Sequence, residues 1–217
     1  LDMDDRIVLS NMAVEIGAKA GIFPYDEILA DWLEKIGVSD HLPVTADDGC
    51  ELAQVLEIDL GTLKPQIALP HRVDNVSDLA DQPFTPVDVV YLGTCTGGRM
   101  RDYVEALTVI SNAGRVSDKV KVVVTPASRQ IYAEMQRIGM LEDFRRYGAQ
   151  IELPGCGACC GTCGSIPKNG QKIISSANRN FRGRMGNATA EIFLASPISC
   201  AEAAVRGGFG GAEGEQL

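Results

Sequence analysis

The stretch VDVVYLGTCTGGR, residues 87–99, decides the fold class. Its apolar run predicts a buried strand over 87–92, and the threonines and glycines after it predict a turn that carries Cys95. The alternation of strand and helix patterns continues along the chain, with helices expected around 100–110, 131–138 and 198–206, and further strands at 120–124, 149–153, 172–176 and 190–194. Strands that alternate with helices predict an α/β fold with a parallel or mixed sheet and helical layers.

The part of the chain before this stretch is organised differently. Apolar residues at helical spacing predict one helix over 4–20, stopped by Gly21, and a second over 26–36, capped by Asp26. Residues 55–60 alternate as a strand would, and an irregular, proline-containing connection follows them. We therefore expect three regions: the end of a preceding α/β domain over 1–75, the α/β domain with the site over 76–208, and a flexible tail over 209–217.

The composition excludes several classes of protein. The chain has 217 residues, of which 45% are hydrophobic and 23% charged, and its net charge is −9 at pH 7. These values suit a packed core and argue against nucleic-acid binding, and no apolar run reaches the roughly 18 residues that a membrane helix needs. Because the first residues lack the features of a secretory signal, we expect a cytoplasmic protein with no membrane partner. The start at Leu1 rather than Met is typical of a processed or truncated product.

Seven cysteines are distributed unevenly, with four of them crowded into residues 156–163. Cys156 and Cys159 follow one predicted strand and Cys95 follows another. Since the carboxyl ends of parallel strands share one sheet edge, we expect these three thiols to meet there. The pattern favours a metal or iron–sulfur site. The open alternatives are a zinc site that uses Cys163, Cys160 or His71 as well, a thioredoxin-like redox pair, and cysteines that are merely small and buried. The isolated Cys50 and Cys200 are expected to be small buried residues.

Two further groups of polar residues are candidates for the site. Residues 176–184 read SANRNFRGR, and arginines offer planar donors suited to carboxylates, which an acidic protein must capture with local positive charge. The alternative is a solvated basic turn, and we keep that interpretation for Arg182. Asn11 and Glu15 lie one turn apart on one face of the first expected helix.

Five motifs stand in the order in which a known family has them: NMAVEIG at 11–17, GTCTGGR at 93–99, LPGCGAC at 153–159, SANRNFRGR at 176–184, and Ser196-Pro197. On these residues the chain resembles the aconitase family over about residues 2–208. Within that family it is most similar to the C-terminal half of the large subunits of the 3-isopropylmalate dehydratase and homoaconitase branch. The resemblance implies an aconitase-like three-layer αβα fold. It also implies a 4Fe–4S cluster held by Cys95, Cys156 and Cys159, with one iron free of protein ligands.

The resemblance implies roles for other residues too. Arg179 and Arg184 are expected to contact substrate carboxylates, and Asn178 is expected to support the cluster. Asn11 and Glu15 are expected near the cluster, with the carboxylate close to the solvent bound there. One local departure is that Gly97 replaces the Asn common in the family, which puts a hydrogen bond near the cluster in doubt.

The activity that the resemblance implies is that of a hydro-lyase of leucine biosynthesis, which isomerises a hydroxy-dicarboxylic acid by dehydration and rehydration. Homoaconitase, 2,3-dimethylmalate dehydratase and aconitase are the alternatives, and a non-catalytic metal- or cluster-binding module is the alternative of another class. The family's N-terminal substrate motifs and the small swivel-domain subunit with the catalytic serine are not in this sequence. We therefore expect the chain to work with both as partners, on a hydroxy di- or tricarboxylate, and to be inactive alone.

Overall fold

The computed structural model describes residues 1–211, and the chain divides into two compact units, Leu1–Leu63 and Lys64–Leu217. The boundary falls before β1 (Gln66–Ala68), because this strand pairs with β2 (Val76–Asp78) and with β8 (Glu191–Ala195). Residues 64–75 therefore belong with the second unit, and the division expected after residue 75 lies too late in the chain.

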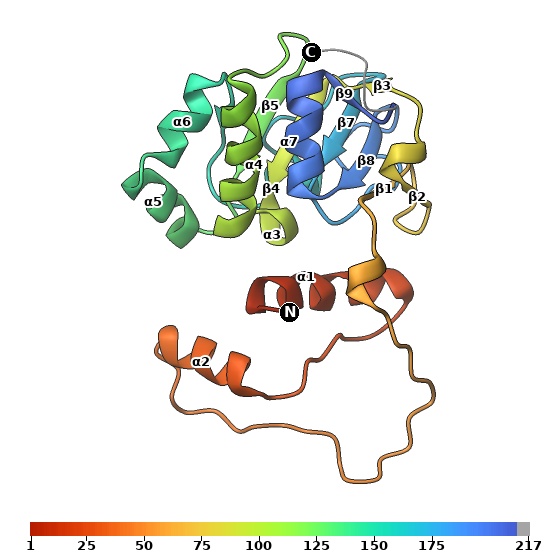
Figure 1. The fold of residues 1–217 in the computed structure, drawn as a ribbon, viewed down its shortest axis with the longest axis vertical. Helices are drawn as coiled ribbons and strands as arrows, with labels where there is room; N and C mark the ends of the chain where they lie inside the picture. The colour runs from red at the N-terminus through yellow and green to blue at the C-terminus, as the bar shows by residue number, and fades with distance from the viewer. Residues whose placement is uncertain (212–217) are drawn as a thin grey trace. The chain divides into compact units, whose positions relative to one another are not determined.

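The first unit consists of short helices joined by irregular chain (Figure 1). Its elements are α1 (Met3–Met12), η1 (Ala13–Ile16), α2 (Glu27–Lys35) and η2 (Leu60–Thr62). α1 begins at Asp2, whose carboxylate accepts a hydrogen bond from the Asp5 amide at 3.0 Å. The 3-10 turn η1 follows it and ends at Gly17, whose φ of 80° stops the helix. The first helix is thus shorter than the expected 4–20, whereas α2 begins at Asp26 as expected.

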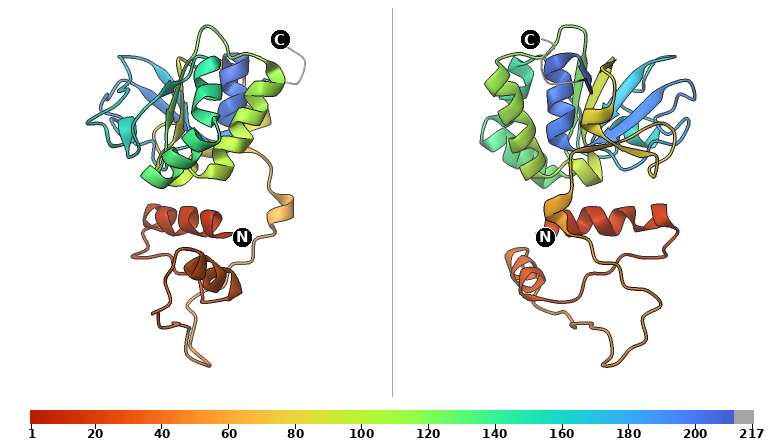
Figure 2. Two further views of the ribbon diagram at one scale, coloured as in Figure 1. Left: turned by 90° about the vertical axis from the view of Figure 1, so that its left-hand side faces the viewer. Right: turned by 45° about the vertical axis from the view of Figure 1, so that its right-hand side comes forward.

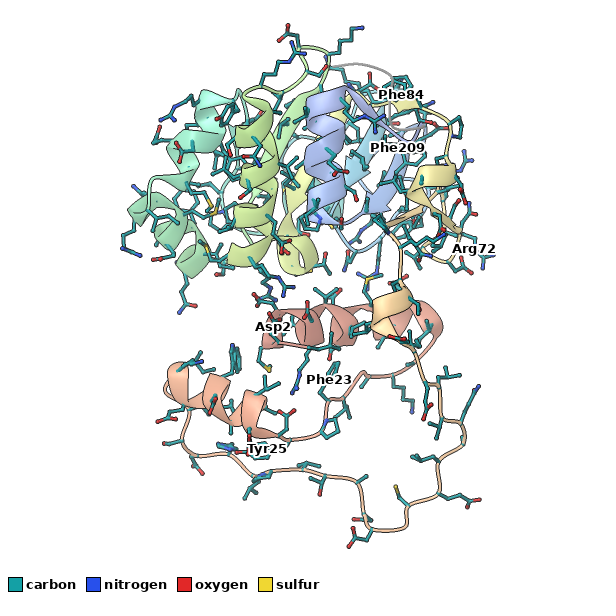
Figure 3. The ribbon with its side chains drawn as sticks, in the orientation of Figure 1. Asp2, Phe23, Tyr25, Arg72, Phe84 and Phe209 are labelled. Atoms are coloured by element: carbon teal, nitrogen blue, oxygen red, sulfur yellow. The ribbon has the colours of Figure 1, made fainter. Side chains whose placement is uncertain are left out.

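Arg6 links the two helices of the first unit. Its Nη1 and Nη2 donate to the two carboxylate oxygens of Asp26 at 2.8 and 2.6 Å. Its guanidinium carbon lies 5.4 Å from the centroid of the Phe23 ring, which Figure 3 labels. All of residues 1–63 are described, and Arg6 is the only buried one among them. A polar contact, and not an apolar core, therefore holds these helices together.

The strand expected at 55–60 does not form. Each of residues 1–63 is described, and none of them lies in a strand. Residues 51–63 are exposed. An alternating pattern produces a strand only where a second strand is available to pair with its backbone. The strand expected at 55–60 is therefore not found, and the assignment of the chain's first region to a preceding α/β domain stays a prediction.

The second unit is built on a seven-stranded mixed sheet with the order β2-β1-β8-β7-β4-β5-β6. Its remaining strands are β4 (Val89–Gly93), β5 (Lys121–Thr125), β6 (Gln150–Ile151) and β7 (Lys172–Ser175). The five strands from β8 to β6 are parallel, whereas β1 is antiparallel to both neighbours. The predicted α/β class with a mixed sheet is confirmed.

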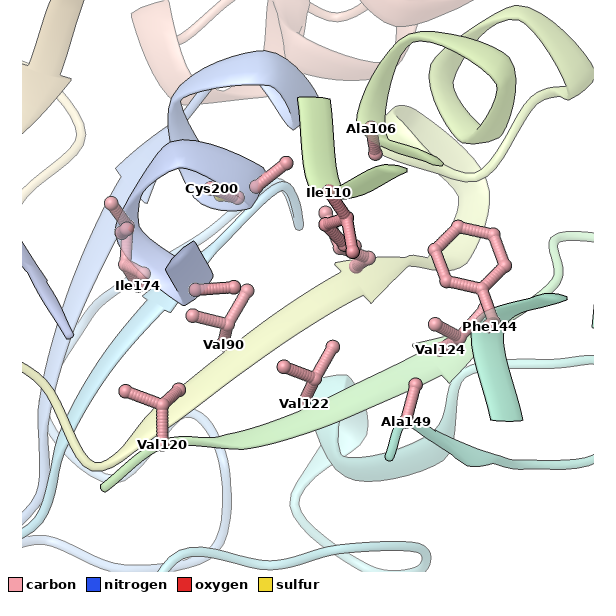
Figure 4. Close-up of a cluster of buried hydrophobic side chains, with 14 of the residues drawn as sticks. Val90, Ala106, Ile110, Val120, Val122, Val124, Phe144, Ala149, Ile174 and Cys200 are labelled. Carbon is pink, nitrogen blue, oxygen red and sulfur yellow. The ribbon is translucent and has the colours of Figure 1, made fainter. Parts of the chain in front are cut away.

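Helices cover one face of this sheet (Figure 2). They are α4 (Met100–Ala113), α5 (Arg129–Arg137), α6 (Met140–Arg146) and α7 (Pro197–Arg206). Figure 4 shows Val90, Val122 and Val124 rising from the sheet towards Ile110 of α4 and Phe144 of α6, and all five are buried. Alternate strand residues face this core because successive side chains of a strand point to opposite faces. No helix within residues 1–211 is long and apolar enough to cross a membrane.

Loops cover the opposite face. Residues of the segments 156–171 and 176–190, which flank β7, pack against the other strand side chains, such as Tyr91 and Val123; Ala158 and Met185 are among them. These two segments contain one 3-10 turn, η4 (Gly157–Cys160), and lie on the far side of the sheet from the helices (Figure 2). The three-layer αβα expectation places helices on this face as well. In the described part of the chain, this layer consists of loops instead. This arrangement brings the cysteine-rich segment directly onto the sheet.

A second, two-stranded ribbon closes the unit. β3 (Thr85–Pro86), which follows the 3-10 turn η3 (Leu79–Asp81), pairs antiparallel with β9 (Gly208–Phe209). Phe209 is buried, with its ring centroid 4.8 Å from that of Phe193, and Figure 3 shows it near Phe84. The expected flexible tail over 209–217 is thus wrong at its start, because Phe209 belongs to the core. Residues 212–217, the rest of that expected tail, lie outside the described residues.

Candidate functional site

Three loops meet at the carboxyl edge of the parallel strands. β4 leads into α3 (Thr94–Gly97) with Cys95, while the chain after β6 carries Cys156 and Cys159. The chain after β7 carries Asn178 and Arg184. β4 pairs parallel with β7 and with β5, and β5 pairs parallel with β6, so these strand ends lie on one side of the sheet. We name the three segments the Cys95 turn (93–98), the Cys156 loop (156–161) and the arginine loop (176–186).

The backbone of the Cys95 turn is strained. Thr94 has a φ of 67°, and it is the only residue other than glycine with a positive φ among residues 1–211. A threonine in this conformation costs about 1–3 kcal/mol. It is buried, and its Oγ1 has no hydrogen-bond partner. Its neighbour Gly93 must be glycine, because a Cβ there would lie 2.1 Å from the Thr125 carbonyl oxygen. The surrounding structure therefore imposes the shape of the turn.

Ser176 holds this turn in place. Its Oγ accepts a hydrogen bond from Gly93 N at 2.9 Å and donates one to Gly97 O at 3.1 Å. Its carbonyl oxygen accepts from Gly97 N at 3.1 Å and from Thr96 Oγ1 at 3.0 Å. The contact also requires glycine at 97, because a Cβ there would lie 2.3 Å from the Ser176 Cβ. This role of Ser176 was not predicted, since its only signal in the sequence is a small polar residue directly after a buried strand.

The Cys156 loop rests on a buried hydroxyl. Tyr91 Oη accepts a hydrogen bond from Ala158 N at 3.0 Å and lies 3.3 Å from the Cys156 carbonyl oxygen. It also lies 2.8 Å from Thr125 Oγ1, which in turn donates to Glu152 Oε2 at 3.1 Å. Burial raises the pKa of Tyr91 above its usual value, so the phenol stays neutral. Two neighbouring strands thus support the loop that carries two of the predicted ligands.

One amide group lies between two of the predicted ligands. Asn178 Nδ2 is 4.0 Å from Cys95 Sγ, and its Oδ1 is 3.7 Å from Cys159 Sγ. Arg184 Nη2 is 3.5 Å from Cys159 Sγ, which is 3% exposed. The pKa of the Cys156 thiol is raised, first by burial and then by the neighbouring thiols, and Arg184 opposes that rise. The structure thus places Cys95 and Cys159 on one amide and Cys156 near enough to both to affect its pKa, and the role of all three as ligands stays a prediction.

Two glycines bring Arg184 to this position. A Cβ on Gly161 would lie 2.7 Å from Gly186 N, so the Cys156 loop and the arginine loop touch through their backbones. The Arg184 guanidinium also lies 5.5 Å from the centroid of the Phe181 ring. Its Nε is buried without a hydrogen-bond partner. This donor is consistent with the prediction that Arg184 binds a carboxylate.

The other polar residues of the arginine loop differ in exposure. Arg179 is half-buried, whereas Arg182 is exposed, as expected for a solvated residue. Asn180 is fully buried, and its Nδ2 donates to Leu69 O at 2.8 Å and to Arg72 O at 3.3 Å. Asn180 therefore anchors the arginine loop to the chain after β1, a role that the sequence did not reveal.

Cys160 and Cys163 form a separate pair, which we call the dithiol. Their Sγ atoms are 3.7 Å apart, and each lies 3.3 Å from the Gly157 carbonyl oxygen. Cys160 Sγ is also 3.1 Å from Thr162 Oγ1, and hydrogen bonding with Thr162 is the main reason that the pKa of Cys160 falls to about 7.

The predictions for residues elsewhere have mixed outcomes. Cys200 is fully buried, as predicted, and burial raises its pKa, whereas Cys50 is exposed and its predicted burial is wrong. Asn11 lies in α1 and Glu15 in η1, so one continuous helix does not carry both. Both belong to the first unit, and their proximity to the cysteines stays a prediction. His71 Nδ1 is buried without a hydrogen-bond partner.

The donor chemistry of the three loops suits an iron–sulfur cluster, because cysteine thiolates are the usual ligands of such a cluster and bind its different irons. Among the described residues, no three His, Cys, Asp or Glu side chains form a group that could hold a metal ion. The zinc alternative would need four ligands around one centre. Six buried side-chain polar atoms of the described residues lack a hydrogen-bond partner. Four of them lie in or next to the three loops: Thr94 Oγ1, Arg99 Nε, Asn180 Oδ1 and Arg184 Nε.

These features define an α/β protein with a thiol- and arginine-lined site at the carboxyl edge of a mixed sheet. Comparison with known sequences agrees with that class, and the chain belongs to the aconitase family. The family model, described as aconitase family (aconitate hydratase), matches residues 1–86 and 80–207.

Several individual relatives are large subunits of one enzyme. The chain is 41% identical over 210 residues to 3-isopropylmalate dehydratase large subunit 1 of Thermotoga maritima. The matched region is 95% of this chain and 50% of that protein. It is 41% identical over 208 residues to large subunit 2 of the Archaeoglobus fulgidus enzyme and 38% identical over 208 residues to the Elusimicrobium minutum large subunit, again with 95% and 50% coverage. The chain thus spans about half the length of these relatives.

Proposed function

We propose that this chain is the cluster-binding half of the large subunit of a hydro-lyase of the 3-isopropylmalate dehydratase type. The reaction isomerises a hydroxy-dicarboxylic acid by removing water and adding it back. The observation that carries the proposal is the meeting of Cys95, Cys159, Asn178 and Arg184 at one sheet edge. The likeness to 3-isopropylmalate dehydratase large subunits supports isopropylmalate as the substrate over homocitrate or citrate.

In this proposal Cys95, Cys156 and Cys159 hold a 4Fe–4S cluster. When bound, the cluster supplies a Lewis acid that makes a substrate hydroxyl a better leaving group. Asn178 Nδ2 donates to Cys95 Sγ and Arg184 Nη2 donates to Cys159 Sγ, so these two donors orient the thiolates. Ser176 and Tyr91 hold the two cysteine-bearing segments by hydrogen bonds to their backbones. The ligands are therefore positioned before the cluster binds, which reduces the entropic cost of binding it.

The arginine loop binds the substrate in this proposal. Arg184 and Arg179 bind the substrate carboxylates with planar, paired donors. Because the chain has a net charge of −9, the positive charge that attracts these carboxylates must be local. Arg184 has one donor on Cys159 and a second, Nε, without a partner. It is therefore placed to connect a carboxylate to a cluster ligand. Asn11 and Glu15, both in the first unit, keep the catalytic roles that the family resemblance implies for them.

The remaining parts of the site come from partners. A hydro-lyase also needs a positioned base, because a Lewis acid alone does not remove a proton from carbon. We propose that the other half of a large subunit and a small swivel-domain subunit with the catalytic serine supply these groups. The proposed enzyme is cytoplasmic and has neither a nucleic acid nor a membrane as a partner. The isolated chain is therefore expected to show no turnover.

The test is anaerobic reconstitution of the purified chain with iron and sulfide, followed by visible absorbance and iron analysis. We expect Cys95→Ser, Cys156→Ser and Cys159→Ser each to abolish loading. Cys50→Ser is the matched control, since this thiol is exposed and lies in the first unit. Normal loading of any of the three variants would refute the ligand assignment. Assays with a complete large subunit and a small subunit on isopropylmalate, homocitrate and citrate would then identify the substrate.

A further inference from the structure

The dithiol has a geometry that the proposed function does not use. Cys160 Sγ and Cys163 Sγ are 3.7 Å apart, which is contact distance for two sulfur atoms. A disulfide needs an S–S distance of about 2.05 Å, and rotation about the side-chain bonds closes most of that difference. Cys163 is exposed and Cys160 half-buried, so a small oxidant reaches the pair. The spacing Cys160-Gly-Thr-Cys163 is also that of redox-active dithiols.

We propose that Cys160 and Cys163 form a reversible disulfide with a hydroperoxide as oxidant, and that this oxidation loosens the Cys156 loop. The first part is independent of the proposed function. The loosening of the Cys156 loop rests on the proposed function only in its effect on the cluster, because Cys156 and Cys159 are proposed ligands.

The chemistry balances with hydrogen peroxide alone. One sulfur attacks a peroxide oxygen, the O–O bond breaks, and a sulfenic acid and one water form. The second sulfur then attacks the first, the S–O bond breaks, and a disulfide and a second water form. The pair loses two electrons and two protons, and the peroxide is reduced to two waters. A small-molecule thiol reverses the step by thiol–disulfide exchange.

The link to the Cys156 loop is the carbonyl of Gly157. This residue lies between Cys156 and Cys159, and its oxygen is 3.3 Å from both sulfurs of the dithiol. When both thiols are protonated, their S–H groups donate to that oxygen. A disulfide carries no S–H group, so oxidation removes both donors at once. The carbonyl then loses the contacts that hold it beside the dithiol, and the loop opens more often.

The other pair with the same spacing is less suited to this chemistry. Cys159 Sγ is 3% exposed and lies between Arg184 Nη2, at 3.5 Å, and Asn178 Oδ1, at 3.7 Å. An incoming peroxide therefore reaches Cys159 less easily than Cys163. We expect the dithiol to oxidise first and the pair Cys156 and Cys159 to stay reduced.

The first experiment uses the full, reduced, metal-free chain and dilute hydrogen peroxide. Free thiols are blocked with one alkylating reagent, the disulfide is reduced, and the released thiols take a second reagent. Trypsin leaves all four neighbouring cysteines in the peptide that follows Arg146 and ends at Lys168, so fragmentation inside this peptide assigns each label. We expect the second label on Cys160 and Cys163 only. The second label on Cys156 and Cys159, or no second label, would overturn the proposal.

The second experiment measures the opening of the Cys156 loop without any cluster. Cys159 is buried in the reduced chain, and we expect its alkylation to be about three- to tenfold faster after oxidation. The reason is that two weak hydrogen bonds, which oppose opening of the Cys156 loop in the reduced chain, are absent from the oxidised chain. The double variant Cys160→Ser/Cys163→Ser is the control, since its hydroxyls still donate to Gly157 O but form no disulfide. Peroxide should leave its Cys159 rate unchanged. An unchanged rate in the oxidised wild type would refute the link to the loop.

A third measurement separates this inference from the proposed function. Oxidised and reduced chains are reconstituted with iron and sulfide, and the visible absorbance is compared. We expect the oxidised chain to take up less cluster, and the double serine variant to be insensitive to peroxide. If no form takes up a cluster, the proposed function fails, while the labelling and alkylation results still decide the disulfide and its effect on the loop. Equal uptake by both forms would refute an effect on the cluster.

Discussion

The two units of this chain are held together in different ways. Residues 1–63 have a single buried residue, Arg6, and expose apolar side chains such as Ile16, Ile22 and Leu42, which are 85–89% exposed. The second unit buries apolar side chains on both faces of its sheet. Its helices also have a core to pack against, whereas α1 and α2 are linked mainly through Arg6 and Asp26.

This difference shows which signals act locally. The caps Asp2 and Asp26 start helices in a unit without an apolar core, because a cap needs only the first turn of its own helix. The stability of a unit depends instead on the apolar area that it buries. We therefore expect the two units to respond differently to similar changes.

Removing an aromatic ring from the core of the second unit should have the largest effect. Phe144 is fully buried and packs edge-on against Tyr103, with ring centroids 6.1 Å apart. We expect Phe144→Ala to lower the free energy of unfolding by about 3–5 kcal/mol, through lost transfer energy and the cavity left behind. Leu56→Ala, at a position 74% exposed in the first unit, should change it by less than about 0.5 kcal/mol. Urea unfolding followed by circular dichroism measures both, and similar losses would contradict the contrast between the units.

Removing the hydroxyl of Ser176 should have an intermediate effect. Ser176→Ala leaves Gly93 N and Gly97 O without their partner inside the protein. We expect unfolding free energy to fall by about 1–3 kcal/mol and Cys95 to be alkylated faster. Ser111→Ala is the control, because the Ser111 hydroxyl donates to Thr108 O at an exposed site. If Cys95 reacts at the wild-type rate in Ser176→Ala, Ser176 does not position the Cys95 turn.

The smallest effect concerns the acid titration of the first unit. Hydrogen bonding with Arg6 lowers the pKa of Asp26 to about 2, from about 4 in an unfolded chain. The stabilisation from this pair is therefore fully present above about pH 4 and is lost as the pH falls through about 2. Trp32 lies on α2 and is the only tryptophan, so its fluorescence should report this loss.

A matched pair of variants checks the assignment of that titration. Asp26→Asn keeps a residue that caps helices well but removes the charge, and the fluorescence change between pH 4 and pH 2 should disappear. Asp59→Asn changes the cap of η2, where Asp59 accepts from Gly61 N at 2.8 Å, and should keep the wild-type titration. A wild-type titration in Asp26→Asn would show that another group is responsible.

Much of the second unit could be predicted from local patterns. The strands between residues 89 and 195 were expected to within two residues, because a short, continuous apolar run between two turns is typical of a buried strand. The closing helix α7 has Ser196 as its cap and ends at Gly207, whose φ is 84°. The same kind of reasoning failed at 55–60, where alternation suggested a strand but the structure offers no partner. It also failed at Phe209, where a glycine-rich context concealed a core residue.

The sequence by itself determined the α/β class, the order of the helices and strands of the second unit, and the placement of Cys95, Cys156 and Cys159 after strand ends. Helix caps, turns and apolar periodicity act over a few residues, so a single chain displays them directly. Only the tertiary structure decided how Ser176 holds the Cys95 turn and how Arg184 reaches Cys159. It alone showed that Cys160 and Cys163 share one carbonyl with the Cys156 loop. The first two of these contacts join residues far apart in sequence, and all of them depend on how loops fold over the sheet, which local patterns do not encode.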